Sequence, residues 1–283
     1  MDGTSVPEGV GGTALAVARA RAAETARPDR LFADPLASVF LDAAGNPEPR
    51  ARAALEPEAV RAVVEMYHWI VARTVFLDAV ATTAVRDGIE QVVVLGAGLD
   101  TRGFRLGWPA TVALFEVDRS DVFSFKESAL RSAGAEPTCL RRTVAVDLRE
   151  DWVPALAAAG FAPAVPALWI AEGLLTYLEA DEVERLLRAV TAASAPGARL
   201  AVTALGIAQD EVAARAAATD PFADIRGLWK RPGPIDIVDR LVEHGWTVEV
   251  TYPRDLLVEA GRIGVREAPS LVGPRLVQAV RPG

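Results

Sequence analysis

Short apolar segments alternate with helical segments through the middle of this 283-residue chain, and this alternation constrains the fold more than any other feature. Strands rich in Val, Leu, Ile and Ala are typical of a sheet that helices cover on both faces. Their alternation with helices predicts an α/β fold with a parallel sheet, whose right-handed crossovers place helices on both sides. The predicted strands are Gln91–Leu95, Thr111–Val117, Arg142–Val146, Ala167–Ala171 and Arg199–Ala204.

Helices are predicted around these strands from apolar residues at helical spacing and from capping signals. They cover Thr13–Ala26, Glu58 to about Val85, Arg119–Ala133, Asp181–Ala193 and Pro234–His244. A turn-rich stretch at Asp29–Phe40 and a loop at Ala43–Pro57 separate the first two. Thr247–Tyr252 and Arg275–Val280 can pair as closing antiparallel strands.

We expect one structural domain overall. Residues 1–12, with several glycines and a proline, are predicted to be a disordered N-terminus, residues 13–86 a helical cap, and residues 87–283 the α/β core. Near residues 206–234 the pattern loosens, which indicates a helical insertion over the edge of the sheet. Its large apolar side chains could line a ligand pocket or simply anchor the loop: Phe222, Leu228 and Trp229.

Composition and charge exclude several classes of protein. With 38 acidic against 30 basic side chains and a net charge of -8, the chain has no basic stripe for a nucleic acid. Its apolar runs fall short of the roughly 20 residues that span a bilayer, so no membrane partner is expected. The lone Cys139 cannot form an intramolecular disulfide, and a buried, inert role suits it better than that of a nucleophile. We therefore expect a cytoplasmic protein, and the lack of any His/Cys cluster at ligand spacing predicts no metal site.

A glycine turn, Gly96-Ala97-Gly98, follows the first strand directly. Residues without bulky side chains let the backbone approach a ligand above the carboxyl end of a parallel strand. Glycines in such a turn also serve only to relieve strain, so this signal is weak by itself. The third glycine of a dinucleotide-binding fingerprint is replaced by Thr101, which disfavours a nicotinamide-dependent enzyme.

The second strand ends in two acidic residues, Glu116 and Asp118. An acid about 20 residues beyond the glycines is placed as a ribose-binding carboxylate would be. Asp118 could instead cap the helix that follows. Since residues two apart on a strand share a face, one acid could serve a ligand while the other braces the loop, and the spacing does not rank them.

Several ordered motifs carry a resemblance that covers the chain from Ala16 to Arg262. The motifs are Phe32-Ala33-Asp34-Pro35-Leu36-Ala37, Arg73-Thr74-Val75-Phe76-Leu77-Asp78, Leu95 to Leu106, Phe115-Glu116-Val117-Asp118, Asp147-Leu148 and Trp169 to Leu178. Together they resemble the leucine carboxyl methyltransferase-like family, in particular its actinobacterial branch of S-adenosyl-L-methionine-dependent methyltransferases. The resemblance implies a class I methyltransferase-like (Rossmann-like) sheet with an antiparallel closing strand, an N-terminal helical cap and a helical insertion.

The resemblance also implies cofactor-binding roles for S-adenosyl-L-methionine. Arg73 would hold the methionine carboxylate, Gly96, Ala97 and Gly98 would form the floor, Asp118 would bind the ribose, Asp147 and Leu148 would address the adenine, and Glu172 would lie near the methionine amine. From the residues alone, Arg73 could instead pair with Asp78 on the surface of its helix, and Glu172 could be an exposed turn acid. Glu172 interrupts a strongly apolar stretch, where burying an unpaired charge would be costly, and this argues against the exposed-acid alternative.

Other members of the pattern are expected in supporting roles. Asp34-Pro35 and Asp100 are expected to brace loops or to support the residues that contact the ligand. Gly103 stands where the family more often has alanine or another small residue. A basic group could close over the site from the first helix and its exit, supplied by one of Arg19, Arg21, Arg27 and Arg30.

Methyl transfer from a sulfonium is an in-line displacement, so alignment supplies much of the rate. An acceptor carboxylate is ionised at neutral pH and needs no base, whereas a hydroxyl or an enolisable carbon does. The candidate catalytic residues are Tyr177, which could also simply pack, and His68, for which a helix-surface role is the stronger alternative. His244 before Gly245 fits a helix C-terminus.

The predicted function is O-methylation of a carboxylate or hydroxyl on a small-molecule acceptor such as a natural product. The alternatives are carboxyl methylation of a protein C-terminus, C-methylation of a keto acid, a nicotinamide-dependent oxidoreductase, and a protein that keeps the cofactor for structure or for a rearrangement. The sequence does not set the oligomeric state.

Overall fold

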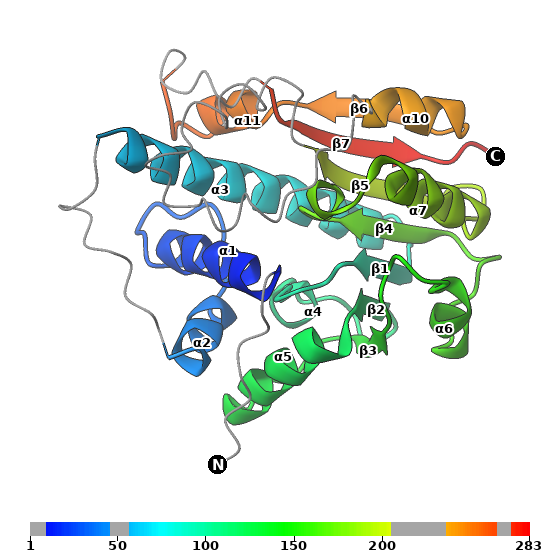
Figure 1. Cartoon of the computed structure of the whole chain (residues 1–283), viewed down its shortest axis with the longest axis horizontal. Coiled ribbons are helices and arrows are strands. Elements are labelled where there is room, and N and C mark those ends of the chain that lie inside the picture. Colours follow the sequence, from blue (N-terminus) through cyan, green and yellow to red (C-terminus); the bar gives the residue numbers. More distant parts are fainter. Residues whose placement is uncertain (1–9, 46–56, 205–235, 265–272) are drawn as a thin grey trace.

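The protein is a layered α/β structure built on one seven-stranded sheet, as seen in a computed structural model that describes residues 10–45, 57–204, 236–264 and 273–283. The strands lie in the order β3-β2-β1-β4-β5-β7-β6 (Figure 1). All pairs are parallel except those of β7, which runs antiparallel between β5 and β6. The strands are β1 Gln91–Leu95, β2 Ala113–Asp118, β3 Leu140–Ala145, β4 Ala167–Ala171, β5 Arg199–Ala204, β6 Thr247–Thr251 and β7 Arg275–Val280. The predicted fold class is confirmed.

Register brings the carboxyl ends of the central strands to one edge of the sheet. Leu95 at the end of β1 lies beside Val117 of β2, so the glycine turn and Asp118 emerge next to each other. Ala171 at the end of β4 lies beside Val202 of β5, so Glu172 and Thr203 also emerge next to each other. In open parallel sheets, this is the edge at which ligands bind.

Alternate residues of the buried strands face two different cores. Val93 and Leu95 of β1 pack in the core beneath α6 (Val153–Ala158), α7 (Ala180–Ala192) and α10 (Ile237–Glu243). Val92 and Val94 pack in the opposite core, beneath α3 (Pro57–Arg86) and α11 (Pro253–Glu259). Burial on both faces of the sheet accounts for the near-continuous Val and Leu residues of β1.

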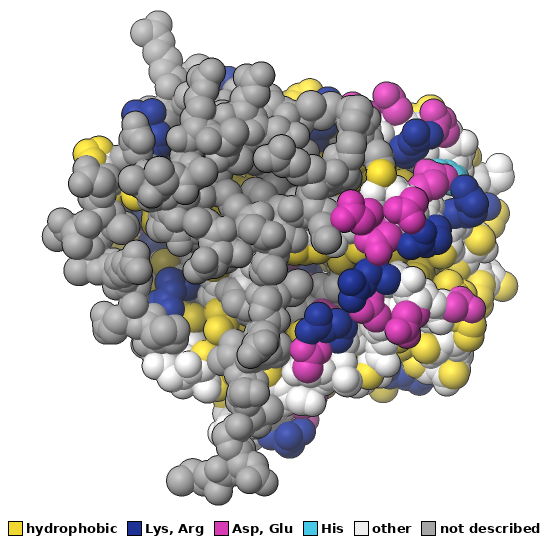
Figure 2. Space-filling model, in the orientation of Figure 1, with side chains coloured by type: hydrophobic (Ala, Val, Ile, Leu, Met, Phe, Trp, Pro, Cys, Tyr) yellow, Lys and Arg dark blue, Asp and Glu magenta, His cyan; other side chains and the backbone are white. Residues whose placement is uncertain are grey.

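A third core joins α1 (Val10–Thr25), α2 (Leu36–Ala43) and α5 (Ser120–Ser132) around Phe40 and Phe125. In Figure 1, α1 lies below α3, and α2 lies below α1 and to the left of α5. In the same view, Figure 2 shows acidic and basic side chains intermingled over the region of α7 and α10. Two short elements lie in the loops after β1 and β4: α4 (Arg102–Arg105) and the 3-10 turn η2 (Leu175–Tyr177). Among the helices that the structure describes, none combines the length and the apolarity needed to cross a membrane.

The structure corrects several predicted boundaries. Helix α2 lies where a turn-rich stretch was expected, because Ala37, Phe40 and Leu41 form a short buried face, and α11 was not predicted at all. Helix α1 begins at Val10, so the last three residues of the expected disordered segment 1–12 are helical. Strand β2 begins two residues late, and β3 both begins and ends earlier than predicted.

The proposed division of the chain stays a prediction. Helix α3 packs against β4, β5 and β7 as well as against α1 and α11, so it covers the sheet in addition to belonging to the expected cap of residues 13–86. The insertion predicted near 206–234, with Phe222, Leu228 and Trp229, lies outside the described residues.

Candidate functional site

A cavity of about 380 Å³ lies at the carboxyl ends of β1, β2 and β4, a size typical of small-molecule sites. It gathers side chains and backbone from segments that the sequence keeps far apart. All eight predicted cofactor-binding residues line it: Arg73, Gly96, Ala97, Gly98, Asp118, Asp147, Leu148 and Glu172. Tyr177 lines it as well, whereas His68 does not.

The turn after β1 needs glycine for backbone reasons at both positions. Gly96 and Gly98 have φ of 64° and 46°, in the left-handed region that side chains disfavour. A Cβ on Gly96 would also come within 3.0 Å of the Leu174 Cδ1 atom. The turn therefore relieves strain and presents open backbone to the cavity at the same time.

The two acids at the end of β2 have separate roles. Glu116 is fully buried and does not line the cavity. It pairs with the Lys126 ammonium at 2.7 Å and with the Arg141 guanidinium, whose nearest nitrogen is also 2.7 Å away. Asp118 lies at the rim, where its Oδ2 accepts the Gly98 N–H at 2.6 Å.

Asp118 does not cap the following helix, because Arg119 is the N-cap of α5. Its second oxygen, Oδ1, accepts the Arg119 N–H at 2.7 Å. Burial raises the pKa of Asp118, against the opposing effect of the N–H bonds from Gly98 and Arg119. One side chain thus both braces the glycine turn and presents a carboxylate to the cavity.

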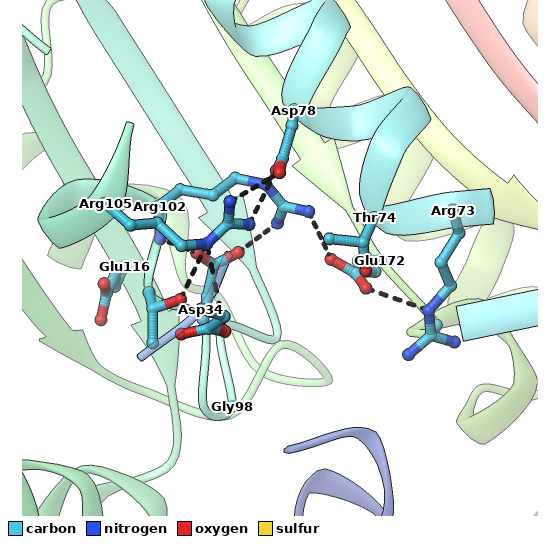
Figure 3. Close-up of polar contacts among 12 residues, drawn as sticks. Asp34, Arg73, Thr74, Asp78, Gly98, Arg102, Arg105, Glu116 and Glu172 are labelled. Carbon is cyan, nitrogen blue, oxygen red and sulfur yellow. Dashed lines mark hydrogen bonds and ion pairs between the residues drawn. The ribbon is translucent and has the colours of Figure 1, made fainter. Parts of the chain in front are cut away.

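Glu172, directly after β4, is the centre of a buried ion-pair network (Figure 3). Its Oε1 accepts from Arg21 at 2.8 Å and from Arg73 at 3.0 Å, and its Oε2 lies 2.9 Å from Arg102 Nη2. Burial alone would raise the pKa of Glu172, but these three guanidinium groups hold that pKa well below its ordinary value. The exposed-acid alternative for Glu172 is wrong.

Arg73 pairs with Glu172 and not with Asp78, so the surface-pair alternative for Arg73 is also wrong. Asp78 accepts instead from Arg102 and Arg105. The Arg73 guanidinium lies over the bare Cα of Gly173, where an added Cβ would stand 3.1 Å from Nη1. No hydrogen bond links its two outer nitrogens to any described residue. Figure 3 shows this fork turned away from the rest of the network.

Asp100 and Asp34 belong to the same network. Asp100 accepts from the backbone N–H and the guanidinium of Arg102, so it braces the turn that leads into α4. The buried carboxylate of Asp34 lies 4.0 Å from both Arg21 and Arg105, and neither of its oxygens has a direct hydrogen bond to any residue that the structure describes. Of the four early arginines considered for the site, Arg21 is the one that lines the cavity.

The far end of the cavity is more open. Asp147 accepts from both the backbone and the side chain of Arg149, and the side-chain bond from Arg149 lowers the pKa of Asp147. Its neighbour Leu148 is half-buried against the core.

His68 lies on α3 with its ring centroid 5.5 Å from that of Tyr67. His244 is the C-cap of α10, as predicted, and lies 3.1 Å from Glu184.

Sequence reasoning missed part of the lining. Thr203 at the end of β5 accepts the Gly173 N–H at 2.8 Å. Met66, Trp69 and Ile70 line the cavity from α3, and their helical spacing from Arg73 was the available signal, although the same spacing also fits plain core packing. No cluster of three potential metal-ligating side chains occurs in the described parts of the chain.

The fold and this edge site define a class of protein. Two solved structures share the architecture over almost the whole chain. One is a protein provisionally described as a methyltransferase from Thermobifida fusca, with 19% identity, 94% of each chain covered and a TM-score of 0.56. The other is a DUF574 family protein from Streptomyces avermitilis, with 14% identity, 94% of this chain and 97% of that chain covered, and a TM-score of 0.60. At such identities the likeness concerns the fold alone, which is the class I methyltransferase fold.

The sequence comparisons identify the family. The model of the family described as leucine carboxyl methyltransferase matches residues 14–191. A relative from Parafrankia sp. is 46% identical over 245 residues, covering 84% of this chain and 77% of its own length. One from Streptomyces avermitilis is 44% identical over 256 residues (90% and 89%), and one from Mycobacterium marinum 38% over 305 residues (99% and 97%). All three are provisionally named S-adenosyl-L-methionine-dependent methyltransferases.

The chain therefore belongs to the leucine carboxyl methyltransferase family. It is a methyltransferase that uses S-adenosyl-L-methionine, and the alternative of a nicotinamide-dependent oxidoreductase is wrong.

Proposed function

We propose that this enzyme transfers the methyl group of S-adenosyl-L-methionine to a carboxylate oxygen of a small acid, such as an acidic natural product. One observation carries the choice of a carboxylate over a hydroxyl or a carbon. Each carboxylate that lines the described cavity is already engaged by arginine or by backbone N–H groups: Asp100, Asp118, Asp147 and Glu172. A hydroxyl acceptor needs a free base, and an ionised carboxylate does not.

The engaged carboxylates are poor proton acceptors for distinct reasons. Three guanidinium groups share Glu172 and hold its pKa well below the ordinary value, far from the near-neutral pKa that suits a general base. Asp118 has its pKa raised by burial, but each of its oxygens already accepts a backbone N–H. Tyr177 is a phenol that can orient an acceptor by hydrogen bonding.

The cavity fits the cofactor on grounds of donor chemistry. Arg73 offers a pair of outer nitrogens that bond to none of the described residues, the fork geometry that binds a carboxylate from two sides. We assign it to the methionine carboxylate, and Glu172 fixes its Nε so that the fork points into the cavity. The other lining residues are assigned to the remaining parts of the cofactor. The turn Gly96, Ala97 and Gly98 forms the floor, and Asp118 binds the ribose hydroxyls. Asp147 and Leu148 contact the adenine, and Glu172 also lies near the methionine amine.

The bound cofactor supplies an electrophilic methyl group on a sulfonium. The protein's task is then to align the acceptor oxygen with the carbon–sulfur bond and to exclude water, which accounts for much of the rate in such displacements. The apolar lining from Trp69 and Ile70 on α3 suits both requirements.

The experiment is a panel of small carboxylic acids and phenols, assayed for S-adenosylhomocysteine release and for the stability of the methyl product. Methyl esters release methanol in mild base, whereas methyl ethers do not. With a carboxylate acceptor, we expect a rate that is flat from about pH 6 to pH 9, since neither acceptor nor enzyme must lose a proton there.

Arg73→Gln should raise the Kd of S-adenosylhomocysteine at least about tenfold, as expected for a lost hydrogen bond to a charged group. The exposed Arg185→Gln serves as the matched control and should leave that Kd unchanged. Base-stable products, or a rate that climbs tenfold per pH unit, would overturn the carboxylate proposal. A peptide with a free C-terminal carboxylate, added to the same panel, separates a small acid from a protein C-terminus.

A further inference from the structure

Glu24 is a wholly buried carboxylate that does not line the cavity. Its Oε1 accepts the Leu31 N–H at 2.6 Å and pairs with the Arg262 guanidinium. Its Oε2 accepts the hydroxyl proton of Tyr67. A single side chain of α1 is thereby bonded to α3 and to the segment after α11, 238 residues further along the chain.

Helix α1 forms one wall of the cofactor cavity. Its residues Thr13, Ala14, Val17 and Arg21 all line the cavity. The helix packs mainly against α2 and α3, so sheet hydrogen bonds do not hold it in place. Its position over the cavity depends on side-chain contacts.

Arg21 and Glu24 lie one helical turn apart on α1 and are neighbours on its surface. Arg21 reaches the cavity and donates to Glu172 at 2.8 Å. A shift of α1 would move both side chains together. The contacts of Glu24 therefore set where the Arg21 guanidinium stands.

The partners of Glu24 come from well-packed parts of the molecule. Arg262 is itself buried, and its backbone N–H donates to the Leu257 carbonyl at 2.8 Å. Leu257 and Ile263, the residue after Arg262, pack in the same core as Trp69 of α3. Burial, together with the bond to Glu24, raises the pKa of Tyr67 to about 12, so its hydroxyl stays a donor at neutral pH.

We propose that Glu24 is a positioning residue, which uses Tyr67 and Arg262 to fix α1 over the cavity and so places Arg21 for cofactor binding. The inference rests on the proposed location of the cofactor site. The physical reason is that a buried carboxylate stripped of its partners is strongly disfavoured. Helix α1 therefore cannot leave its position without breaking all of these bonds together.

Three variants and one control test this role. Arg262→Gln removes the closer of the two ion pairs of Glu24 and leaves the longer one, with Arg27 at 3.9 Å. Tyr67→Phe removes only a hydroxyl and keeps the ring in place. The control, Arg275→Gln, breaks the ion pair of Arg275 with Asp236 at 2.7 Å, between β7 and the start of α10. All are compared by calorimetric titration with S-adenosylhomocysteine, by thermal unfolding, and by hydrogen exchange over Val10–Thr25.

We expect Arg262→Gln to raise the Kd of S-adenosylhomocysteine about tenfold, within the usual range of coupling between distant groups. Tyr67→Phe should raise it severalfold, and both should speed hydrogen exchange in α1 selectively. Arg262→Lys, which keeps the charge, should recover most of the affinity. Arg275→Gln should change the Tm alone.

A lowered Tm with unchanged Kd and unchanged exchange in α1 for Tyr67→Phe and Arg262→Gln would overturn the proposal and leave Glu24 a merely stabilising group. If Arg262→Gln does not fold, Tyr67→Phe decides by the same measurements. If the wild-type chain fails to bind S-adenosylhomocysteine, the proposed function fails. In that case, exchange over α1 still tests whether Glu24 fixes that helix.

Discussion

Replacing Glu172 by glutamine tests how strongly the buried ion-pair network stabilises the protein. The glutamine keeps the shape of the side chain but removes the charge that Arg21, Arg73 and Arg102 share. Removing one partner of a buried pair costs about 3–5 kcal/mol, a large part of a total stability of roughly 5–15 kcal/mol. At about 2 °C per kcal/mol for a chain of this size, we expect the Tm to fall by at least about 6 °C at pH 7.

The pH dependence of this effect has a definite sign. The pKa of Glu172 in the folded protein lies well below its ordinary value of 4.5, because the guanidinium charges outweigh the effect of burial. A carboxylate with a depressed pKa contributes stability that is fully present above its ordinary pKa and is lost as the pH falls through its folded-state pKa. The difference in Tm between wild type and Glu172→Gln should therefore be full at pH 7 and shrink below about pH 4.5.

The matched control for this prediction is Glu184→Gln. Glu184 also pairs with an arginine, the exposed Arg188 at 3.2 Å, and with His244 at 3.1 Å, but the Glu184 side chain is itself 31% exposed. Exposed pairs contribute little, so its Tm should stay within about 2 °C of wild type. If Glu172→Gln behaves like this control in thermal unfolding followed by circular dichroism, the reasoning about the network is refuted.

Three further predictions concern single positions. Asp118→Asn should raise the Kd of S-adenosylhomocysteine by about tenfold or more, since one charged acceptor is lost; an unchanged Kd on calorimetric titration would contradict the ribose assignment. Gly103→Ala places a Cβ 2.5 Å from the Leu114 Cδ2 atom and should lower the free energy of unfolding by about 1 kcal/mol or more. Leu114→Val in the same chain should recover part of that loss, and strictly additive losses in urea unfolding would count against the clash. Burial and then the charge of Glu116 raise the pKa of Cys139 to about 11, so its thiol should react with a disulfide reagent at pH 8 only on unfolding, and rapid reaction of the folded enzyme would disprove this.

The sheet and its ligand-binding edge could be predicted from sequence because their signals are local. Strands β1 and β4 match their predicted limits. Each predicted site residue on the sheet edge ends a strand or follows one within a few positions. Parallel strands bring such positions together regardless of the connecting loops. For this reason Gly98, Asp118 and Glu172 line one cavity although long segments separate them.

The pairing of charges could not be predicted in the same way. Arg73 and Asp78 lie five residues apart on one helix, yet Arg73 pairs with Glu172, 99 residues away. Local spacing decides pairs on exposed helices, whereas buried charges take whichever partner the fold presents, because leaving one unpaired is costly. The choice of Arg21 among four early arginines depends on the same tertiary contacts.

The short helix α2 was not predicted from the sequence for a related reason. Helix α2 has eight residues and follows Asp34-Pro35, a strong turn signal. Its buried face, with Phe40 at its centre, packs against α1 and α5. Tertiary packing provides most of the stability of so short a helix, so the local pattern is a poor guide to it.

The balance of charge around the cavity bears on the order in which ligands bind. Its described lining holds equal numbers of cationic and anionic side chains: Arg21, Arg73, Arg119 and Arg149 against Asp100, Asp118, Asp147 and Glu172. An acid entering alone would leave net negative charge in a partly buried space. S-adenosyl-L-methionine carries one net positive charge, on its sulfonium, so the bound cofactor favours binding of an acceptor anion. The product S-adenosylhomocysteine has no net charge, so it does not favour binding of the anion in this way. An acceptor acid that binds equally well to the free enzyme, to the S-adenosylhomocysteine complex and to the complex with a cationic cofactor analogue would show that this balance plays no part.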